Sequence, residues 1–247
     1  MSEAPEAAPC GFYGKVPMLG DFVARRLPAS FLNPWDAWLQ EAVGRSRERL
    51  GERWRGYYLT CPIWRFAMGE GLCGPEAWTG VLMPSVDRVG RYFPLTLARP
   101  LPGRVSPLGI LEDPWFGRAE AIALSVLERE MMDLESFDHD VSGLGSLTAS
   151  LRGRGEHAPS MQDGPYGLRL RVGEPADFGV LAPVIGHELL ARQIGSYSLW
   201  WSAGSEVVVP ELLICPGMPV PDVYTDMMGA DGRNGERRVC PVTGAGT

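Results

Sequence analysis

Cysteine pairs and long apolar runs are missing from this sequence, and each shortage narrows what the chain can be. Its five cysteines are odd in number and widely spaced, with no C-x-x-C pair that would indicate a metal knuckle or a redox dithiol. No window approaches the roughly 18 consecutive apolar residues of a membrane-spanning helix. We therefore expect a protein of a reducing compartment, without a disulfide framework, a cofactor or membrane insertion.

Positive charge is also in short supply. Acidic residues outnumber basic residues by 30 to 23, the net charge is −7, and Lys15 is the only lysine. This balance argues against a general affinity for nucleic-acid phosphates or anionic lipid. The start of the chain, MSEAPEAAPC, has two acids and no apolar run, so it does not resemble a signal peptide. We expect a cytoplasmic protein with no nucleic-acid partner.

The chain has 247 residues, enough to bury one large hydrophobic core. The Ala-, Pro- and Glu-rich residues 1–9 predict a disordered leader, and the Gly-rich residues 229–247 predict a mobile tail. Residues 10–228 are expected to form a single domain. Because this chain holds 31 glycines and 22 prolines, its helices and strands should be short and joined by many turns.

Two helices carry clear boundary signals. The first is predicted over residues 34–50, because Asn33 can cap it, a proline suits its first position and Gly51 suits its end. Its apolar residues recur at three-and-four spacing, which predicts one buried stripe. The second helix repeats this punctuation, with Asp113 as the cap and Pro114 at the first position.

The remaining elements follow from shorter patterns. Strands are predicted over residues 57–68, 78–83, 91–101, 167–172, 197–202 and 207–215. Further helices are predicted over residues 136–152, 182–194 and 219–228, with a loop at 153–164. Because the strands come in runs with short connections, the fold class is α+β, with a mainly antiparallel central sheet.

The adjacent pair Trp200 and Trp201 bears on how this sheet is covered. On a strand, neighbouring side chains point to opposite faces, so either helices cover both faces or one tryptophan is exposed. We expect a covered sheet, which makes a three-layer α/β/α sandwich. Trp201 is kept as a candidate contact residue, because an exposed tryptophan is often a hot spot of a protein interface.

Familiar catalytic patterns fail in this sequence. Lys15 follows Gly14 as in a phosphate loop, but Pro9 and Val16 stand where that motif needs a glycine and a hydroxyl residue. No serine lies in a G-x-S-x-G elbow.

Histidine chemistry has equally little support. His187 and Glu188 begin like a zinc-protease helix, yet Ala191 replaces the second histidine. His157, in a predicted loop, is the one histidine with a candidate exposed role. These failures predict a protein that is not an enzyme.

Two segments place charged residues among glycines, prolines and aromatics. The first is residues 11–22, GFYGKVPMLGDF, and the second is residues 83–94, MPSVDRVGRYFP. Glycine and proline fix the backbone of a loop, so its polar side chains are presented at defined positions. The candidate partner-binding residues in these segments are Lys15, Asp21, Ser85, Asp87, Arg88 and Arg91.

Two other interpretations of these residues remain open. Asp87 can pair with Arg88 or Arg91, and Asp21 can cap a turn, merely to hold the loops in shape. Alternatively, if the two loops converge on one concavity, their polar residues could form a pocket for a small ligand or an enzyme active site. Internal ion pairs among these side chains would count against the pocket.

The same segments carry a family resemblance. Residues 11–28 (GFYGKVPMLGDFVARRLP), 35–40 (WDAWLQ), 61–69 (CPIWRFAMG) and 78–98 (WTGVLMPSVDRVGRYFPLTLA) resemble the TagF, or ImpM, family of bacterial type VI secretion-associated proteins. The resemblance is good over residues 10–100 and returns at SLWWSAGSE, residues 198–206.

The resemblance implies a cytoplasmic accessory protein that restrains the secretion apparatus after translation by binding other components. It suggests a forkhead-associated scaffold protein of the same system as the partner. It defines no functional residues, so the loop residues above stay the candidates.

Overall fold

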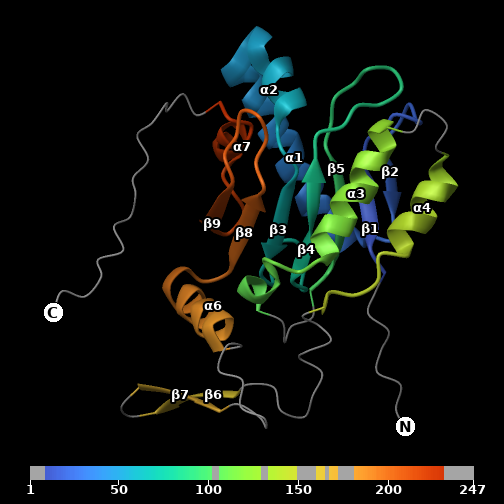
Figure 1. Cartoon of the computed structure of the whole chain (residues 1–247). Helices are drawn as coiled ribbons and strands as arrows, with labels where there is room; N and C mark the ends of the chain where they lie inside the picture. The colour runs from blue at the N-terminus through green and yellow to red at the C-terminus, as the bar shows by residue number, and fades with distance from the viewer. Residues whose placement is uncertain are drawn as a thin grey trace.

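A seven-stranded antiparallel sheet forms the centre of the protein in the computed structural model, which describes residues 9–101, 106–128, 133–148, 160–164, 167–171 and 181–230. The strand order is β2-β1-β5-β4-β3-β8-β9 (Figure 1). The bounds are β1 (Gly11–Gly14), β2 (Val23–Arg25), β3 (Trp64–Met68), β4 (Trp78–Met83), β5 (Leu95–Pro100), β8 (Tyr197–Ser202) and β9 (Glu211–Pro216). Two more strands, β6 (Ser160–Gly164) and β7 (Gly167–Arg171), form a separate hairpin.

One face of the sheet is covered by α1 (Ala29–Leu50), the short helices η1 (Gly51–Arg53) and α2 (Trp54–Thr60), and α7 (Pro221–Met227). Aromatic rings dominate this layer. Trp35 of α1 stacks on Trp200 of β8 with ring centroids 5.9 Å apart, and Trp38 lies 5.1 Å from the same ring. The indole N–H of Trp35 donates to Thr96 and that of Trp38 to the carbonyl of Pro219, so both buried polar groups are satisfied.

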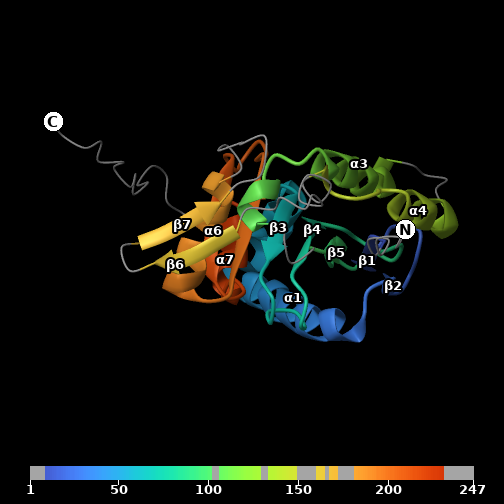
Figure 2. The same cartoon turned by 90° about the horizontal axis from the view of Figure 1, so that it is seen from below.

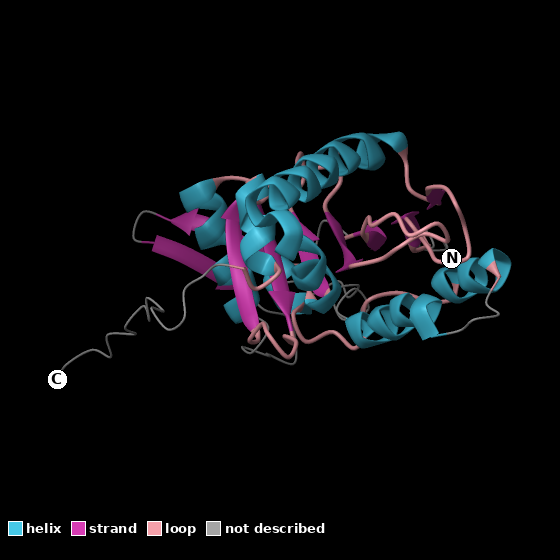
Figure 3. Ribbon diagram, turned by 90° about the horizontal axis from the view of Figure 1, so that it is seen from above, coloured by secondary structure: helices cyan, strands magenta, loops and turns pink. Residues whose placement is uncertain are grey.

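The other face is covered by α3 (Trp115–Glu128) and α4 (Leu134–Ser142), with η2 (Pro107–Ile110) and α6 (Leu181–Ile194) packed beside them. Phe116 of α3 meets Trp201 edge-on at 4.8 Å, and Phe137 of α4 meets Phe12 of β1 at 4.9 Å. Figures 2 and 3 show α1 on one side of the strands and α3 with α4 on the other.

The predicted three-layer sandwich is therefore confirmed. Trp200 and Trp201 point into opposite aromatic layers and both are buried, so the sheet is covered on both faces at β8. Trp35, Trp38, Trp64 and Trp115 are buried in the core as well. Alternation along β3 and β4 supplies the two layers, because successive side chains point to opposite faces.

Several predicted boundaries are wrong in an instructive way. The first helix starts at Ala29 and not at Pro34, which lies inside it. Phe31 explains the earlier start, because it is fully buried against Trp35 and Trp78. Its packing extends the helix despite the proline. The predicted end at Gly51 is correct, with a φ of 53° that favours glycine.

Residues 54–60 form helix α2, where a strand was predicted from residue 57. Trp54 and Tyr58 stand four residues apart and stack at 4.6 Å, so burial of one helical face overrides the β preference of aromatics. The strand predicted from residue 91 begins only at Leu95, and the one predicted from residue 207 begins only at Glu211.

The distal half was predicted in outline. The strand at 197–202 is correct, and α6, α7 and β7 lie within one or two residues of their predicted bounds. The helix predicted at 136–152 is α4, which begins earlier because Asp133 caps it by accepting a hydrogen bond from the Ser136 N–H at 2.7 Å. The predicted end is wrong, because α4 ends at Ser142. Residues 160–164, predicted as loop, form β6. The predicted leader and tail lie outside the described residues, apart from Pro9, Gly229 and Ala230.

In the part of the chain that the structure describes, no helix is both long and apolar enough to cross a membrane.

The centre of the sheet leads to a stability prediction. A Cβ on Gly80 of β4 would overlap the carbonyl oxygen of Leu97 and lie 2.7 Å from the ring of Phe66. We expect Gly80→Ala to lower the melting temperature by more than about 5 °C, because overpacking forces β4 and β5 apart. The control is Gly44→Ala in α1, which meets nothing within 4 Å. It should raise the melting temperature by about 2 °C through helix propensity. Equal melting temperatures of the two variants in a calorimetric scan would contradict this account.

Candidate functional site

The two glycine- and proline-rich segments lie side by side at one end of the sheet. Residues 15–22 connect β1 to β2, residues 84–94 connect β4 to β5, and β1 pairs with β5. The Arg88 N–H donates to the carbonyl of Leu19 at 2.9 Å, and the Ser85 hydroxyl donates to the carbonyl of Lys15 at 2.7 Å. The two loops therefore contact each other, which the sequence left open as a condition of the pocket interpretation.

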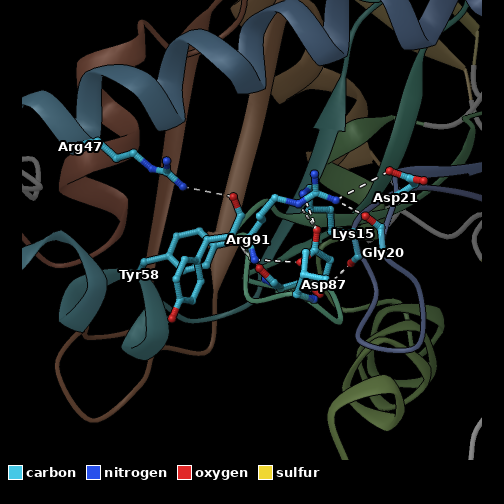
Figure 4. A network of polar contacts seen from close by, with 10 residues as sticks. Lys15, Gly20, Asp21, Arg47, Tyr58, Asp87 and Arg91 are labelled. Carbon is cyan, nitrogen blue, oxygen red and sulfur yellow. Dashed lines mark hydrogen bonds and ion pairs between the residues drawn. The ribbon is translucent and has the colours of Figure 1, made fainter.

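Asp87 is the centre of this arrangement (Figure 4). Its Oδ2 accepts hydrogen bonds from Lys15 Nζ at 2.6 Å and from Arg91 Nε at 2.7 Å. Its Oδ1 accepts from the backbone N–H groups of Val89 at 3.0 Å and Arg91 at 2.8 Å. The Asp87 side chain is 0% exposed. A buried carboxylate with four charged or backbone donors thus joins both loops into one unit.

The electrostatics of Asp87 follow from this geometry. Burial by itself raises the pKa of this carboxyl group, but hydrogen bonds from Lys15 and from the backbone and side chain of Arg91 lower it further than burial raises it. The net result is a pKa well below the usual range for aspartate. Asp87 therefore stays ionised at neutral pH and holds Lys15 as its counter-ion.

The turn after Asp87 is shaped by the same contacts. The Asp87 N–H donates to the carbonyl of Arg91, and the Gly90 N–H donates to the carbonyl of Asp87, both at 3.0 Å. Gly90 has a φ of 84°, in the left-handed region where glycine is favoured. This closes a tight turn whose outermost residues are Arg88 and Val89, and Val89 is 65% exposed.

Aromatic residues lock the base of the two loops. The Tyr58 hydroxyl, brought in by α2, donates to the carbonyl of Ser85 at 2.9 Å and accepts from the Ser85 N–H at 3.0 Å. Lys15 Nζ lies 5.0 Å from the centre of the Phe22 ring, and Phe22 packs edge-on against Phe93 at 4.8 Å. Neither Tyr58 nor Phe22 stood out in the sequence, since Tyr58 lay in a segment predicted as strand.

The candidate residues divide by exposure into two groups. Lys15, Ser85 and Asp87 are buried and bound to one another's loops, so a partner cannot touch them while the loops keep this conformation. Arg88 and Arg91 are exposed, as is Asp21, whose side chain is 98% exposed and lies 3.7 Å from Arg91. Arg91 also donates to the carbonyl of Gly20.

Trp201 lies apart from these loops. It sits in β8, which β4 and β3 separate from β5, and it packs under α3 with 8% exposure. Its burial leaves no exposed indole at β8, so its contribution is to the core between the sheet and α3.

The cysteines and His187 lie in surroundings that do not favour a reactive role. Burial raises the pKa of the Cys10, Cys61 and Cys73 thiols to about 12, so these groups stay protonated at neutral pH. His187 Nδ1 lies 2.7 Å from the Tyr197 hydroxyl, and this contact is partly buried. Among the described residues, no three His, Cys, Asp or Glu side chains gather where they could hold a metal ion. His157 lies outside the described residues.

Comparison with known proteins adds a family to this geometry. Residues 11–144 match the family described as the TagF N-terminal domain, type VI secretion system-associated, which is more than half of the chain. The chain belongs to the TagF family. This match includes both loops of the Asp87 network. The sequence resemblance was clear up to residue 100, and the match reaches 44 residues further.

A solved structure extends the likeness over the distal half. The crystal structure of PA0076 from Pseudomonas aeruginosa PAO1 is 36% identical in sequence, with a TM-score of 0.74, and the match covers 91% of this TagF chain and 96% of that chain. No curated protein sequence matches this chain. The protein is thus a TagF-family, type VI secretion-associated protein, and a solved structure resembles its fold over 91% of the chain.

The Asp87 network gives a pH-dependent prediction. Because the pKa of Asp87 is lower in the folded chain than in the unfolded chain, its carboxylate stabilises the fold above about pH 4 and loses this effect as the pH falls further. At pH 7, Asp87→Asn should lower the melting temperature by at least about 5 °C, since Lys15 is left buried without its counter-ion. The gap between wild type and variant should shrink as the pH is lowered from about 5 to about 2.5.

The matched control for this experiment is Asp21→Asn. Its carboxylate is exposed, and its ion pair with Arg91 is long, at 3.7 Å. The melting temperature should therefore change by less than about 1 °C, both at pH 7 and at low pH. A gap for Asp87→Asn that stays constant with pH would show that the carboxylate charge is not what stabilises the loops.

Proposed function

We propose that this TagF-family protein is a non-enzymatic regulator of the type VI secretion system that acts by binding another protein. It represses the system after translation, and its partner is the forkhead-associated scaffold protein of the apparatus or another cytoplasmic component. It works in the cytoplasm, where such components are accessible. Membership of a type VI secretion-associated family supports the biological context of this proposal.

The observation that carries the proposal is the rigid presentation of an exposed turn. Arg88, Val89 and Arg91 project from loops whose base is fixed by the buried Lys15–Asp87 ion pair. A turn that is already ordered loses little conformational entropy when it binds, which favours recognition by a second protein. An exposed valine between two arginines offers a partner both apolar area and positive charge.

The rival proposal is a small-ligand or enzyme site built from the same loops. It requires polar groups that are free to meet a substrate. The charged groups of Lys15 and Asp87 are instead bound to each other and to Arg91, and the side chain of Lys15 is 6% exposed. The high thiol pKa values of the buried cysteines likewise give no support to nucleophilic catalysis. These contacts favour the binding protein over the enzyme.

A pull-down tests the regulator directly. Purified tagged protein, mixed with an extract of a type VI-active bacterium, should retain the forkhead-associated scaffold at a stoichiometric ratio. Val89→Asp combined with Arg88→Glu should reduce the retained scaffold by at least about tenfold, because the double variant buries a carboxylate and reverses a charge at the contact. Quantitative mass spectrometry of the bound fraction provides the measurement.

Two comparisons make the pull-down decisive. Arg118→Glu, an exposed arginine on α3 across the sheet, should retain the scaffold as wild type does. The double variant must also keep the wild-type melting temperature, so that lost binding is not lost folding. Retention of no type VI component by the wild-type protein would refute the proposal. Co-purification at a fixed ratio with the assembled apparatus would instead indicate a structural subunit.

A further inference from the structure

A second exposed surface lies beside the Asp87 loops, at the end of α1 and along α2. It consists of three arginines, each over an aromatic ring, and we call it the arginine–aromatic surface: Arg47, Arg53, Arg55, Trp54, Tyr57 and Tyr92. All three arginines are exposed, whereas Trp54 is 6% exposed and the two tyrosines are half-buried. The rings therefore form a floor, and the guanidinium groups lie above it.

The arginines of this surface are held in place. The Arg47 guanidinium lies 4.3 Å from the centre of the Trp54 ring, and it donates to the carbonyl of Tyr92 at 3.3 Å (Figure 4). Arg55 lies 5.9 Å from the Tyr92 ring and Arg53 lies 6.0 Å from the Tyr57 ring. Stacking on a ring restricts a long side chain while leaving its N–H donors free to bind an anion.

These three arginines differ from their neighbours in ion pairing. Among the described residues, Arg47, Arg53 and Arg55 have no carboxylate partner, whereas the neighbouring Arg45 and Arg49 are paired with Glu48 and Asp226. The whole chain has a net charge of −7. A local group of unpaired arginines on an acidic protein is an electrostatic feature that selects a negatively charged partner surface.

Apolar side chains adjoin these arginines. Leu59 of α2 is 56% exposed and stands four residues after Arg55, so both lie on the same face of the helix. Tyr92 connects the surface to the Asp87 loops, because it follows Arg91 and its ring packs against Trp54 at 5.7 Å and Tyr58 at 5.6 Å. The arginine–aromatic surface is thus continuous with the exposed turn at Arg88 and Arg91.

We infer that the arginine–aromatic surface binds an acidic, carboxylate-rich segment of the partner protein, an inference that rests on the proposed function as a binding protein. Each guanidinium presents paired N–H donors that match a carboxylate in a bidentate geometry. The half-buried rings and Leu59 add contact area for apolar residues between the acids. Binding neutralises arginines that form no ion pair with a carboxylate among the described residues, so no such ion pair has to be broken.

A nucleic acid is the other anion that stacked arginines suit, and the charge balance disfavours it. A nucleic acid carries phosphates along its whole length, and a chain with a net charge of −7 repels phosphates that extend beyond the arginines. A short acidic protein segment can end where the arginines end. The structure therefore assigns this surface to a protein segment.

Fluorescence anisotropy with a labelled octaglutamate peptide tests this assignment on the full-length protein. We expect binding at about 20 mM salt that weakens markedly at about 150 mM salt, because the contacts are exposed charges. Arg53→Glu and Arg55→Glu should each weaken binding by at least about fivefold. Arg118→Glu, which makes the same change in net charge on α3, should leave the affinity within about twofold of wild type.

Three outcomes of the anisotropy measurement overturn the assignment. Octaglutamate that fails to bind at low salt refutes an acid-binding surface. Equal weakening by Arg118→Glu and Arg55→Glu shows that only net charge matters. A labelled oligothymidine that binds more tightly than octaglutamate, and loses binding in Arg55→Glu, makes nucleic acid the occupant. Each variant should keep the wild-type melting temperature, which would show that its folding is intact.

This experiment separates the inference from the proposed function. The peptide measurement needs only the purified protein, whereas the pull-down needs a type VI component. Octaglutamate binding that depends on Arg53 and Arg55, without any captured type VI component, would keep the surface and reject the regulator. Capture of the scaffold by Arg53→Glu and Arg55→Glu at wild-type levels would keep the regulator and reject this surface.

Discussion

The carboxylate of Asp87 accepts four hydrogen bonds, two from the side chains of Lys15 and Arg91 and two from backbone N–H groups. These contacts join a loop between β1 and β2 to a loop between β4 and β5. Removing a carboxylate from water is costly, and here the cost is offset because every contact is made to a charged or backbone donor. The exposed turn at residues 88–91 keeps its shape because Asp87, the residue before it, is anchored in this way.

The sheet beneath the loops supplies the rigidity that the anchor needs. Aromatic layers cover both faces, with Trp35 and Trp38 against Trp200 on one side and Phe116 against Trp201 on the other. Close-packed rings leave little freedom for strands to slide, so the ends of β4 and β5 are fixed in space. Tyr58 then transmits this order from α2 to the loop through its two hydrogen bonds with Ser85.

Two exposed features adjoin this rigid base, and both have the character of a protein-binding surface. One is the turn that carries Arg88, Val89 and Arg91, and the other is the group of arginines stacked on Trp54, Tyr57 and Tyr92. Both combine positive charge with apolar area on ordered backbone, a composition suited to protein contacts. The family assignment sets these surfaces in the context of type VI secretion.

Local pattern alone was sufficient for much of the fold. Strand β4, strand β8, the end of α1 and the capping of α3 by Asp113 were predicted correctly, because alternation, glycine punctuation and capping act between residues close in the chain. The family was likewise recognisable from residues 11–28 and 78–98. Local pattern could not predict the elements that depend on tertiary contacts. α2 forms where aromatic residues predicted a strand, and α1 begins before Pro34 so that Phe31 is buried.

The candidate site shows the same division. The sequence alone indicated that Lys15, Asp87 and Arg91 lie on stiff loops, but it left open whether they face a partner, a ligand or one another. Lys15 and Asp87 are 72 residues apart in the chain, and their ion pair exists because β1 pairs with β5. The stacking of Arg55 on Tyr92 depends in the same way on how α2 packs against the sheet. Sequence determined which side chains were available, and the three-dimensional packing decided which of them stay exposed, since burial and pairing are set by neighbours distant in the chain.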